Sequence, residues 1–161
     1  MQNSQPKDPQ SLIKTYNLTP HPEGGYYREL YRSTLDVNSP AVNDTRSAVT
    51  HIYYLLLKGD ISRFHLVHHD EIWHVYEGAP LKLIQYDGAN LKEELIGSGC
   101  QDYFSVVKRE NYQAAETTGD YTLIGCTVAP GFDFKDHIYI SDDKEKADVI
   151  LNKYPEYKRF L

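Results

Sequence analysis

Turn-forming residues recur at short intervals along most of this chain, and this feature constrains the fold more than any other. The turn signals are His69-Asp70, Gly78, Asp87-Gly88, Gly97-Ser98-Gly99 and Gly119-Asp120. The segments between them are short and rich in Val, Ile, Leu and Tyr, which is typical of strands. We predict strands near residues 26–33, 47–57, 61–67, 71–77, 80–86, 91–96, 103–107, 112–116 and 121–128. Many short strands at this spacing indicate an all-β sandwich or barrel.

The two ends of the chain carry helical signals instead. Asp8 and Pro9 form a good helix start, an N-cap followed by a proline at the first helical position. Near the other end, Asp142 and Glu145 match a capping box, and Pro155 ends the predicted helix. Because we find no internal repeat and no linker, we expect one domain over residues 1–161, with residues 1–7 disordered.

Composition excludes several classes of protein. The 161 residues correspond to about one domain, and the longest apolar run, Ile52 to Leu57, is far shorter than a membrane span. A net charge of −6 argues against binding to a nucleic-acid backbone. Two cysteines are too few for a secreted disulfide scaffold, and the first residues do not resemble a signal peptide. We therefore expect a cytoplasmic protein that binds neither nucleic acid nor membrane.

The densest group of ionisable side chains lies between Gly59 and Gly78, where four of the seven histidines occur. His65 is on a predicted strand and Glu71 begins the next strand, so the two can face each other across a hairpin. A histidine beside a carboxylate suits a metal site or an acid–base pair. From spacing alone, a solvated turn with incidental histidines is equally acceptable. We expect His68 and His69 to be turn residues of this kind.

Four further side chains are candidates for ligand binding. Glu23 follows His-Pro and precedes two glycines, a rigid turn that can hold a carboxylate at the rim of a pocket. Arg28 and Arg46 can each hold an anionic group through a bidentate guanidinium, although a surface ion pair is the alternative. Trp73 shares strand parity with Glu71, which suggests a pocket wall or a core position. The sequence contains no P-loop, dinucleotide motif or Ser-His-Asp motif, so kinase, dehydrogenase and hydrolase activities lack support.

Residues 59–78 resemble the first cupin motif, a glycine, a His-x-His pair, a glutamate and a second glycine at set steps. His65 and Glu71 occupy the expected positions, whereas Val67 replaces the second histidine. The second cupin motif is recognisable only by its place between strands, and Gln113 stands where its histidine is expected. An amide both donates and accepts hydrogen bonds, so Gln113 can orient a ligand without titrating.

More specifically, the chain resembles the cupin subfamily catalogued as DUF985, or cupin type 5. The matching stretches are residues 21–29, 52–56, 62–65, 70–74, 78–81, 112–115 and 126–134. The resemblance implies an all-β fold, a double-stranded β-helix or jelly roll, here with short N- and C-terminal helices. It also implies a homodimer, in which the Tyr-rich strand 26–33 could pair across a two-fold axis. It implies no particular reaction.

Two functions remain open from the sequence. By analogy with jelly-roll epimerases of deoxysugar nucleotides, the protein is an epimerase- or isomerase-like enzyme for a sugar or sugar-nucleotide-like substrate. His65 is then the general base, and Glu71 or Tyr53 orients it or returns the proton. Alternatively, it is a non-catalytic cupin that binds a small ligand. In either case the expected ligand-binding side chains are Glu23, Arg28, Arg46, Trp73 and Gln113.

A metal cofactor is not predicted with confidence from this sequence. His65 and Glu71 are strong donors, and Gln113 is a weak one. A stable transition-metal site usually needs at least three good donors. We therefore expect a divalent metal to bind weakly or not at all, and this weakens a third interpretation, a metal-dependent oxygenase.

Overall fold

The computed structural model describes residues 8–161, so the prediction for residues 1–7 lies outside the described residues. The strands are β1 (Thr19–Pro20), β2 (Tyr26–Arg32), β3 (Asp36–Ser39), β4 (Asp44–Ser47), β5 (Thr50–Leu57), β6 (Ile61–Val67), β7 (Asp70–Gly78), β8 (Leu81–Tyr86), β9 (Leu91–Ile96), β10 (Phe104–Val107), β11 (Tyr112–Thr117), β12 (Tyr121–Ala129) and β13 (His137–Tyr139). The helices are α1 (Pro9–Thr15) and α2 (Lys144–Lys153), with 3-10 turns η1 (Phe134–Asp136), η2 (Ile140–Asp142) and η3 (Pro155–Phe160). None of the described helices is long and apolar enough to cross a membrane.

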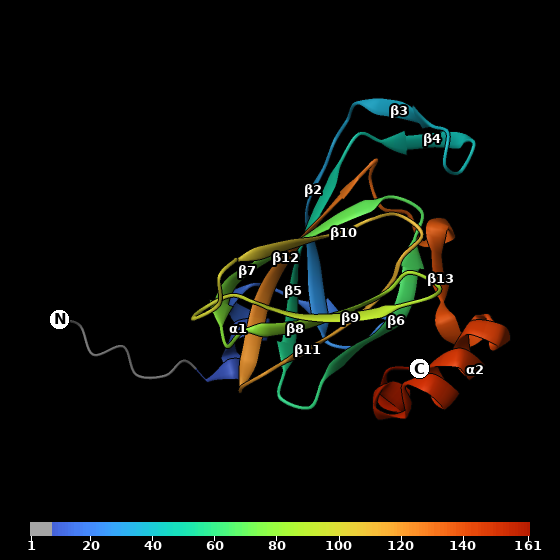
Figure 1. Ribbon diagram of the computed structural model, residues 1–161. Helices are drawn as coiled ribbons and strands as arrows, with labels where there is room; N and C mark the ends of the chain where they lie inside the picture. Colours follow the sequence, from blue (N-terminus) through green and yellow to red (C-terminus); the bar gives the residue numbers. More distant parts are fainter. Residues whose placement is uncertain (1–7) are drawn as a thin grey trace.

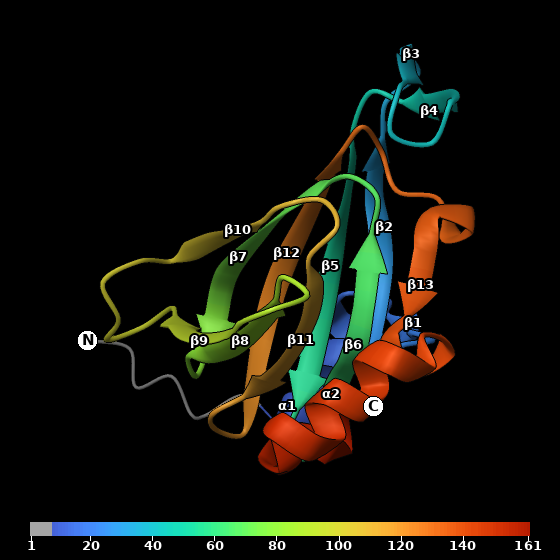
Figure 2. The same ribbon diagram turned by 45° about the vertical axis from the view of Figure 1, so that its right-hand side comes forward.

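Two antiparallel sheets form the body of the molecule. The larger sheet has the order β1-β2-β5-β12-β7-β10, and the smaller has the order β13-β6-β11-β8-β9. Figures 1 and 2 show these sheets facing each other, with the β3–β4 hairpin projecting beyond one end. This arrangement confirms the predicted all-β jelly roll with short terminal helices. Apart from Ser47, the hairpin lies in residues for which the sequence predicted no strand.

Alternation along the strands separates the inside of the barrel from the outside. On β7, Glu71, Trp73 and Val75 are buried, whereas Tyr76 is exposed. Trp73 and Val75 pack into the apolar cluster between the sheets, with Tyr54 and Ile124 from neighbouring strands. Alternate side chains of a strand point to opposite faces, so the predicted parity of β7 is confirmed.

The C-terminal segment covers the outer face of the smaller sheet. Ile150 of α2 and Phe160 of η3 join a buried cluster with Phe64 of β6 and Ile84 of β8. Figure 2 shows α2 lying against this side of the barrel. Because the outer face of β6 is covered in this way, Phe64 and Leu66 are buried outside the barrel while His65 points into it.

The two helices begin close to the predicted positions. Asp8 caps α1 by accepting a hydrogen bond from the backbone N–H of Gln10 at 3.2 Å. The N-cap of α2 is Asp143 rather than the predicted Asp142, because the Asp143 side chain accepts from the N–H of Lys146. Asp142 instead belongs to the preceding turn η2.

Candidate functional site

An internal cavity of about 330 Å³ lies on the inner face of the larger sheet. Aromatic side chains form much of its wall, and four carboxyl side chains line it. Its lining residues are His21, Glu23, Tyr27, Glu29, Arg32, Thr50, Ile52, Tyr54, Glu71, Trp73, Cys126, Val128, Phe132, Asp133 and Phe134. A concave, largely apolar space with a few convergent polar groups is the usual form of a small-molecule site.

The turn between β1 and β2 places Glu23 inside the barrel. Gly24 and Gly25 have φ of +117° and +67°, and a Cβ on Gly24 would lie 2.1 Å from the carbonyl oxygen of Ile61. Only glycine permits this close approach of the turn to β6. The Tyr54 hydroxyl donates to the Gly24 carbonyl at 2.8 Å, which fixes the turn from the other side. As a result Glu23 is only 5% exposed and lies deeper than the expected rim position.

Histidines surround the Glu23 carboxylate. His137 Nε2 donates to Glu23 Oε1 at 2.8 Å, and His65 Nε2 lies 3.3 Å from the same oxygen. The Ser62 hydroxyl donates to Oε2 at 3.0 Å. Burial alone would raise the pKa of Glu23, but His65, His137 and His21 outweigh burial and lower the pKa to about 2. Glu23 is therefore a buried carboxylate whose pKa its histidine neighbours hold well below that of an ordinary glutamate.

Gln113 connects His65 with Glu71, and Trp73 sets the orientation of its amide. The indole N–H of Trp73 donates to Gln113 Oε1 at 2.8 Å. An indole nitrogen can only donate, so this oxygen must face Trp73 and the amide nitrogen must face the other two residues. Gln113 Nε2 accordingly donates to His65 Nε2 at 3.1 Å and to Glu71 Oε2 at 2.5 Å.

This network defines the protonation of His65. Because Nε2 accepts from Gln113, the proton is on Nδ1, which donates to the backbone carbonyl of Arg63 at 2.8 Å. Burial lowers the pKa of His65 to about 4, more than the nearby charge of Glu23 raises it. His65 is therefore a neutral imidazole at pH 7.

The pKa of Glu71 is shifted in the opposite direction to that of Glu23. Burial, with the negative charge of Glu23 as the second cause, raises the pKa of Glu71 to about 8. Two carboxyl groups in one cavity thus carry different charges near neutral pH: Glu23 is ionised and Glu71 holds a proton. Pairs of carboxyl groups with separated pKa values are typical of acid–base sites.

Glu23, His65 and His137 form a group with the donor set of a metal site. Their ligand atoms all lie within 4.8 Å of one another. His137 lies directly opposite Val67 in the β13–β6 register, and opposite residues share a face of the sheet. His137 therefore supplies, from the neighbouring strand, an imidazole beside the position where the cupin motif has its second histidine. The carbonyl of Arg63 holds His65 in the tautomer that leaves Nε2 available, as outer hydrogen bonds do for metal-binding histidines.

The structure places the predicted site residues in two groups. His65, Glu71, Trp73 and Gln113 are joined by the hydrogen bonds described above, and Glu23 lies against His65. The weak metal candidates Glu71 and Gln113 do not belong to the donor cluster: Gln113 presents its amide nitrogen, which cannot ligate, to His65.

Tyr53, Arg28 and Arg46 are not among the residues that line the cavity. Tyr53 packs against Tyr16 and Tyr76, with ring centroids at 5.2 and 5.8 Å, and its neighbour Tyr54 lines the cavity instead. Arg28 is paired with Tyr53 in the β2–β5 register and shares its outer face. The guanidinium of Arg46 forms a bidentate pair with Asp136 and also contacts Asp44, so its donors serve the fold.

Sequence reasoning missed His137 and His21, and it undervalued His69. His137 is part of a three-residue strand whose pairing with β6 no local pattern indicates. His21 accepts from the N–H of Glu23 at 3.2 Å, a contact made by the turn itself. His69, expected to be a solvated turn residue, is only 3% exposed.

An antiparallel jelly roll that encloses a cavity, with histidine and carboxyl side chains converging on it, defines a protein of the cupin class. Residues 10–140 match the family described as Cupin superfamily (DUF985), and the chain belongs to this family.

Relatives of similar length support this assignment. The chain is 30% identical to the uncharacterized protein YML079W of Saccharomyces cerevisiae, over 90% of this chain and 81% of that protein. Among solved structures, a hypothetical protein from Leishmania major has a TM-score of 0.79 at 26% identity, covering 92% of this chain and 93% of that one. Protein SO0799 from Shewanella oneidensis has a TM-score of 0.77 at 29% identity, covering 99% and 94%.

Proposed function

We propose that this protein is a metal-dependent enzyme that acts on a small polar molecule in the internal cavity. The observation that carries the proposal is the cluster of Glu23, His65 and His137, whose ligand atoms lie within 4.8 Å of one another. Two imidazoles and one carboxylate form the donor set of many catalytic centres of divalent transition metals, with positions left for substrate. A bound metal would supply Lewis acidity toward a substrate oxygen.

The chain's own residues supply the remaining chemistry. Glu71 lines the cavity and, with a pKa raised to about 8 by burial, holds a proton that it can donate to a substrate near neutral pH. Gln113 holds Glu71 and His65 in fixed positions, and Trp73 fixes Gln113. Trp73 and Tyr54 line the same cavity as Glu71 and give it an apolar wall.

The epimerase-like alternative requires His65 as a general base, and the geometry supports it less well. His65 is 2% exposed, and its Nε2 already accepts a hydrogen bond from Gln113. Burial lowers its pKa to about 4, so it binds a proton weakly at pH 7. Among residues 8–161, no contact in the cavity singles out a sugar or a nucleotide as substrate. His65 therefore fits the role of a metal ligand better than that of a base.

Metal binding tests the proposal directly. Protein stripped with chelator is titrated with Mn²⁺, Co²⁺, Ni²⁺ and Zn²⁺ and measured by calorimetry and elemental analysis. We expect one equivalent of at least one metal to bind the wild type, and His137→Gln to weaken its binding at least 100-fold. His74→Gln is the matched control, because His74 lies on the outer face of β7 and stacks on Tyr76.

Two results would contradict the metal site: a wild type that binds no metal, and a His137→Gln variant that binds as the wild type does. Native mass spectrometry of protein purified without chelator then identifies any retained small molecule. Metal and ligand bound without turnover of that ligand would instead favour the second candidate, a non-catalytic binding cupin.

A further inference from the structure

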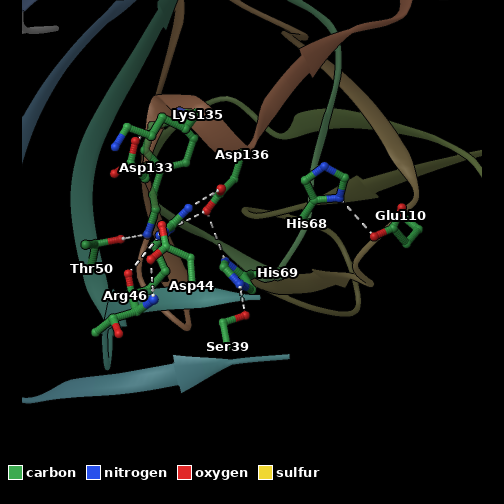
Figure 3. Close-up of polar contacts among 12 residues, drawn as sticks. Ser39, Asp44, Arg46, Thr50, His68, His69, Glu110, Asp133, Lys135 and Asp136 are labelled. Atoms are coloured by element: carbon green, nitrogen blue, oxygen red, sulfur yellow. Dashed lines mark hydrogen bonds and ion pairs between the residues drawn. The ribbon is translucent and has the colours of Figure 1, made fainter. Parts of the chain in front are cut away.

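A second group of polar side chains lies beside the turn of the β3–β4 hairpin, where Ser39 pairs with Asp44, and away from the internal cavity. Ser39 ends β3, His69 lies in the turn between β6 and β7, and Asp136 ends η1. The Ser39 hydroxyl is 2.7 Å from His69 Nε2, and His69 Nδ1 is 3.8 Å from Asp136 Oδ2. Figure 3 shows the three side chains in this order, with the imidazole between the hydroxyl and the carboxylate. None of these three residues belongs to the site around Glu23 and His65.

The surrounding charges decide the tautomer of His69. Within the part of the chain that the structure describes, Nδ1 has no hydrogen-bond partner and the nearest charged group it faces is Asp136. Attraction by that carboxylate places the proton on Nδ1. Nε2 is then an acceptor, so the Ser39 hydroxyl donates to it. This is the protonation pattern of a serine activated by a histidine base.

Asp136 is held firmly in this position. Arg46 donates to both of its oxygens, from Nε at 2.8 Å and from Nη2 at 2.7 Å. The bidentate pair holds the carboxylate in a fixed orientation beside the imidazole, as the third group does in a hydroxyl–imidazole–carboxylate arrangement. Burial lowers the pKa of His69, so the imidazole is neutral at pH 7 and its Nε2 is free to accept the Ser39 hydrogen bond.

The hydroxyl and the imidazole lie at a second pocket, of about 360 Å³. Its lining residues are Ser39, Pro40, Ala41, His69, Asp70, Arg109, Ala129 and Pro130. Four of the eight lining residues are small and apolar, Arg109 brings a positive charge and Asp70 a negative one. Such a space fits a short acyl group, with a cation available to the oxygen that becomes negative during acyl transfer.

We propose that Ser39, His69 and Asp136 form a nucleophilic site that hydrolyses small carboxylic esters through an acyl-serine intermediate. The Ser39 oxygen attacks the ester carbonyl carbon as its proton passes to His69 Nε2, and the carbonyl electron pair moves to the oxygen. When that pair returns, the bond to the alcohol breaks and the alcohol leaves with the proton from His69. Water then attacks the acyl-serine in the same way, which gives the carboxylic acid and restores Ser39.

The same contacts also fasten the hairpin to the barrel, because Ser39 belongs to the hairpin and Asp136 to the barrel side. A purely mechanical tether needs the hydrogen bond between Ser39 and residue 69 but does not need a base. His69→Gln separates the two roles: glutamine can keep the hydrogen bond to Ser39, but it does not take up a proton at neutral pH.

The experiment treats the full-length protein with a fluorophosphonate probe and follows the adduct by intact mass and peptide mapping. We expect one adduct per chain, located at Ser39, and a burst of p-nitrophenol from p-nitrophenyl acetate. Ser39→Ala should lose both signals, and His69→Gln should slow labelling more than 100-fold. Ser47→Ala and His68→Gln are matched controls: Ser47 of β4 donates to the backbone carbonyl of Ser33, and His68 pairs with Glu110 at 3.0 Å.

Absence of an adduct on the wild type, or an adduct at another residue, would overturn the proposal. Equal labelling of His69→Gln and wild type would overturn the role of His69 as base. Melting temperatures show whether each variant is folded, and if Ser39→Ala is not, the mapped position of the wild-type adduct decides. Labelling in the presence of chelator is expected to be unchanged, so the result does not depend on the metal site.

Discussion

At the scale of single residues, the cavity shifts the pKa values of two carboxyl groups, those of Glu23 and Glu71, in opposite directions. Both Glu23 and Glu71 are buried, and burial alone raises the pKa of either carboxyl. Glu23 is surrounded by three histidines and a serine, whereas Glu71 has as hydrogen-bond partners an amide and the thiol of Cys126. The difference in partners, rather than in depth, makes one an anion and the other a proton donor.

This difference predicts how stability depends on pH. Glu71 has a pKa raised from 4.5 to about 8, so between these values the unfolded chain ionises while the folded protein keeps the proton. The unfolded state then binds fewer protons, so the free energy of unfolding falls as pH rises, by at most roughly 1.4 kcal/mol per pH unit. In Glu71→Gln this pH-dependent fall in the free energy of unfolding is absent, because glutamine does not ionise. In urea denaturation of metal-free protein, we expect the variant to gain stability over wild type between pH 5 and 8.

The comparison uses the difference between variant and wild type at each pH. Glu23 and the histidines titrate in both proteins, so their contributions largely cancel. A difference that stays constant from pH 5 to pH 8 would show that Glu71 is ionised in the folded protein, and it would remove this residue as proton donor.

At the scale of secondary-structure elements, the β3–β4 hairpin depends on one buried ion pair. Arg46 of β4 is 8% exposed and Asp136 is 2% exposed, and the two form a bidentate contact (Figure 3). Arg46→Met leaves the Asp136 carboxylate buried without its cation. Such a loss typically lowers the free energy of unfolding by about 3–5 kcal/mol. Arg32→Met is the control, because Arg32 and Glu29 form the same bidentate geometry with side chains more than 40% exposed. Arg32→Met is expected to lower the free energy of unfolding by at most about 1 kcal/mol.

Denaturation of both variants by urea measures this contrast. Equal, small losses in the two would mean that the hairpin does not depend on the buried pair. Loss of hydrogen-exchange protection confined to residues 33–49 would show that Arg46→Met frees the hairpin while the barrel stays folded.

The sequence predicted the strands better than it predicted the site, and the reason is physical. Alternation within a strand is local, so parity indicated that Glu71 and Trp73 share a face, and the resemblance to the cupin motif indicated that His65 and Glu71 point inward. Tyr53 was assigned to the site although parity separates it from Tyr54, because local pattern does not say which of two adjacent tyrosines faces inward. His137 could not be found from local pattern, because it reaches the site only through pairing of β13 with β6, about 70 residues earlier in the chain.

At the scale of the whole molecule, the outer face of the larger sheet carries a row of exposed aromatic and apolar side chains. Phe104 lies opposite His74 and Val106 lies opposite Ile72 in the β10–β7 register, and Tyr76 extends the row along β7. Tyr31 of β2, paired with His51 of β5, lies on the same face. Tyr31, Tyr76 and Phe104 are 50–55% exposed. Contiguous exposed patches of this kind mark interaction surfaces more often than single exposed residues do.

The homodimer implied by the family resemblance is therefore predicted to form through this face, which includes Tyr31 of the Tyr-rich strand β2. The strand β1 pairs with Tyr26 and Tyr27 and so covers part of the edge of β2. Light scattering should give twice the mass of the chain at micromolar concentration.

Phe104→Glu places a charge in the centre of such an interface, and two-fold symmetry repeats that charge on the partner. The dimer of this variant is therefore expected to dissociate. Leu95→Glu, an equally exposed position on β9 of the other sheet, should leave the dimer intact. A monomeric wild type contradicts the dimer, and a dimer that survives Phe104→Glu but not Leu95→Glu would place the interface on the smaller sheet.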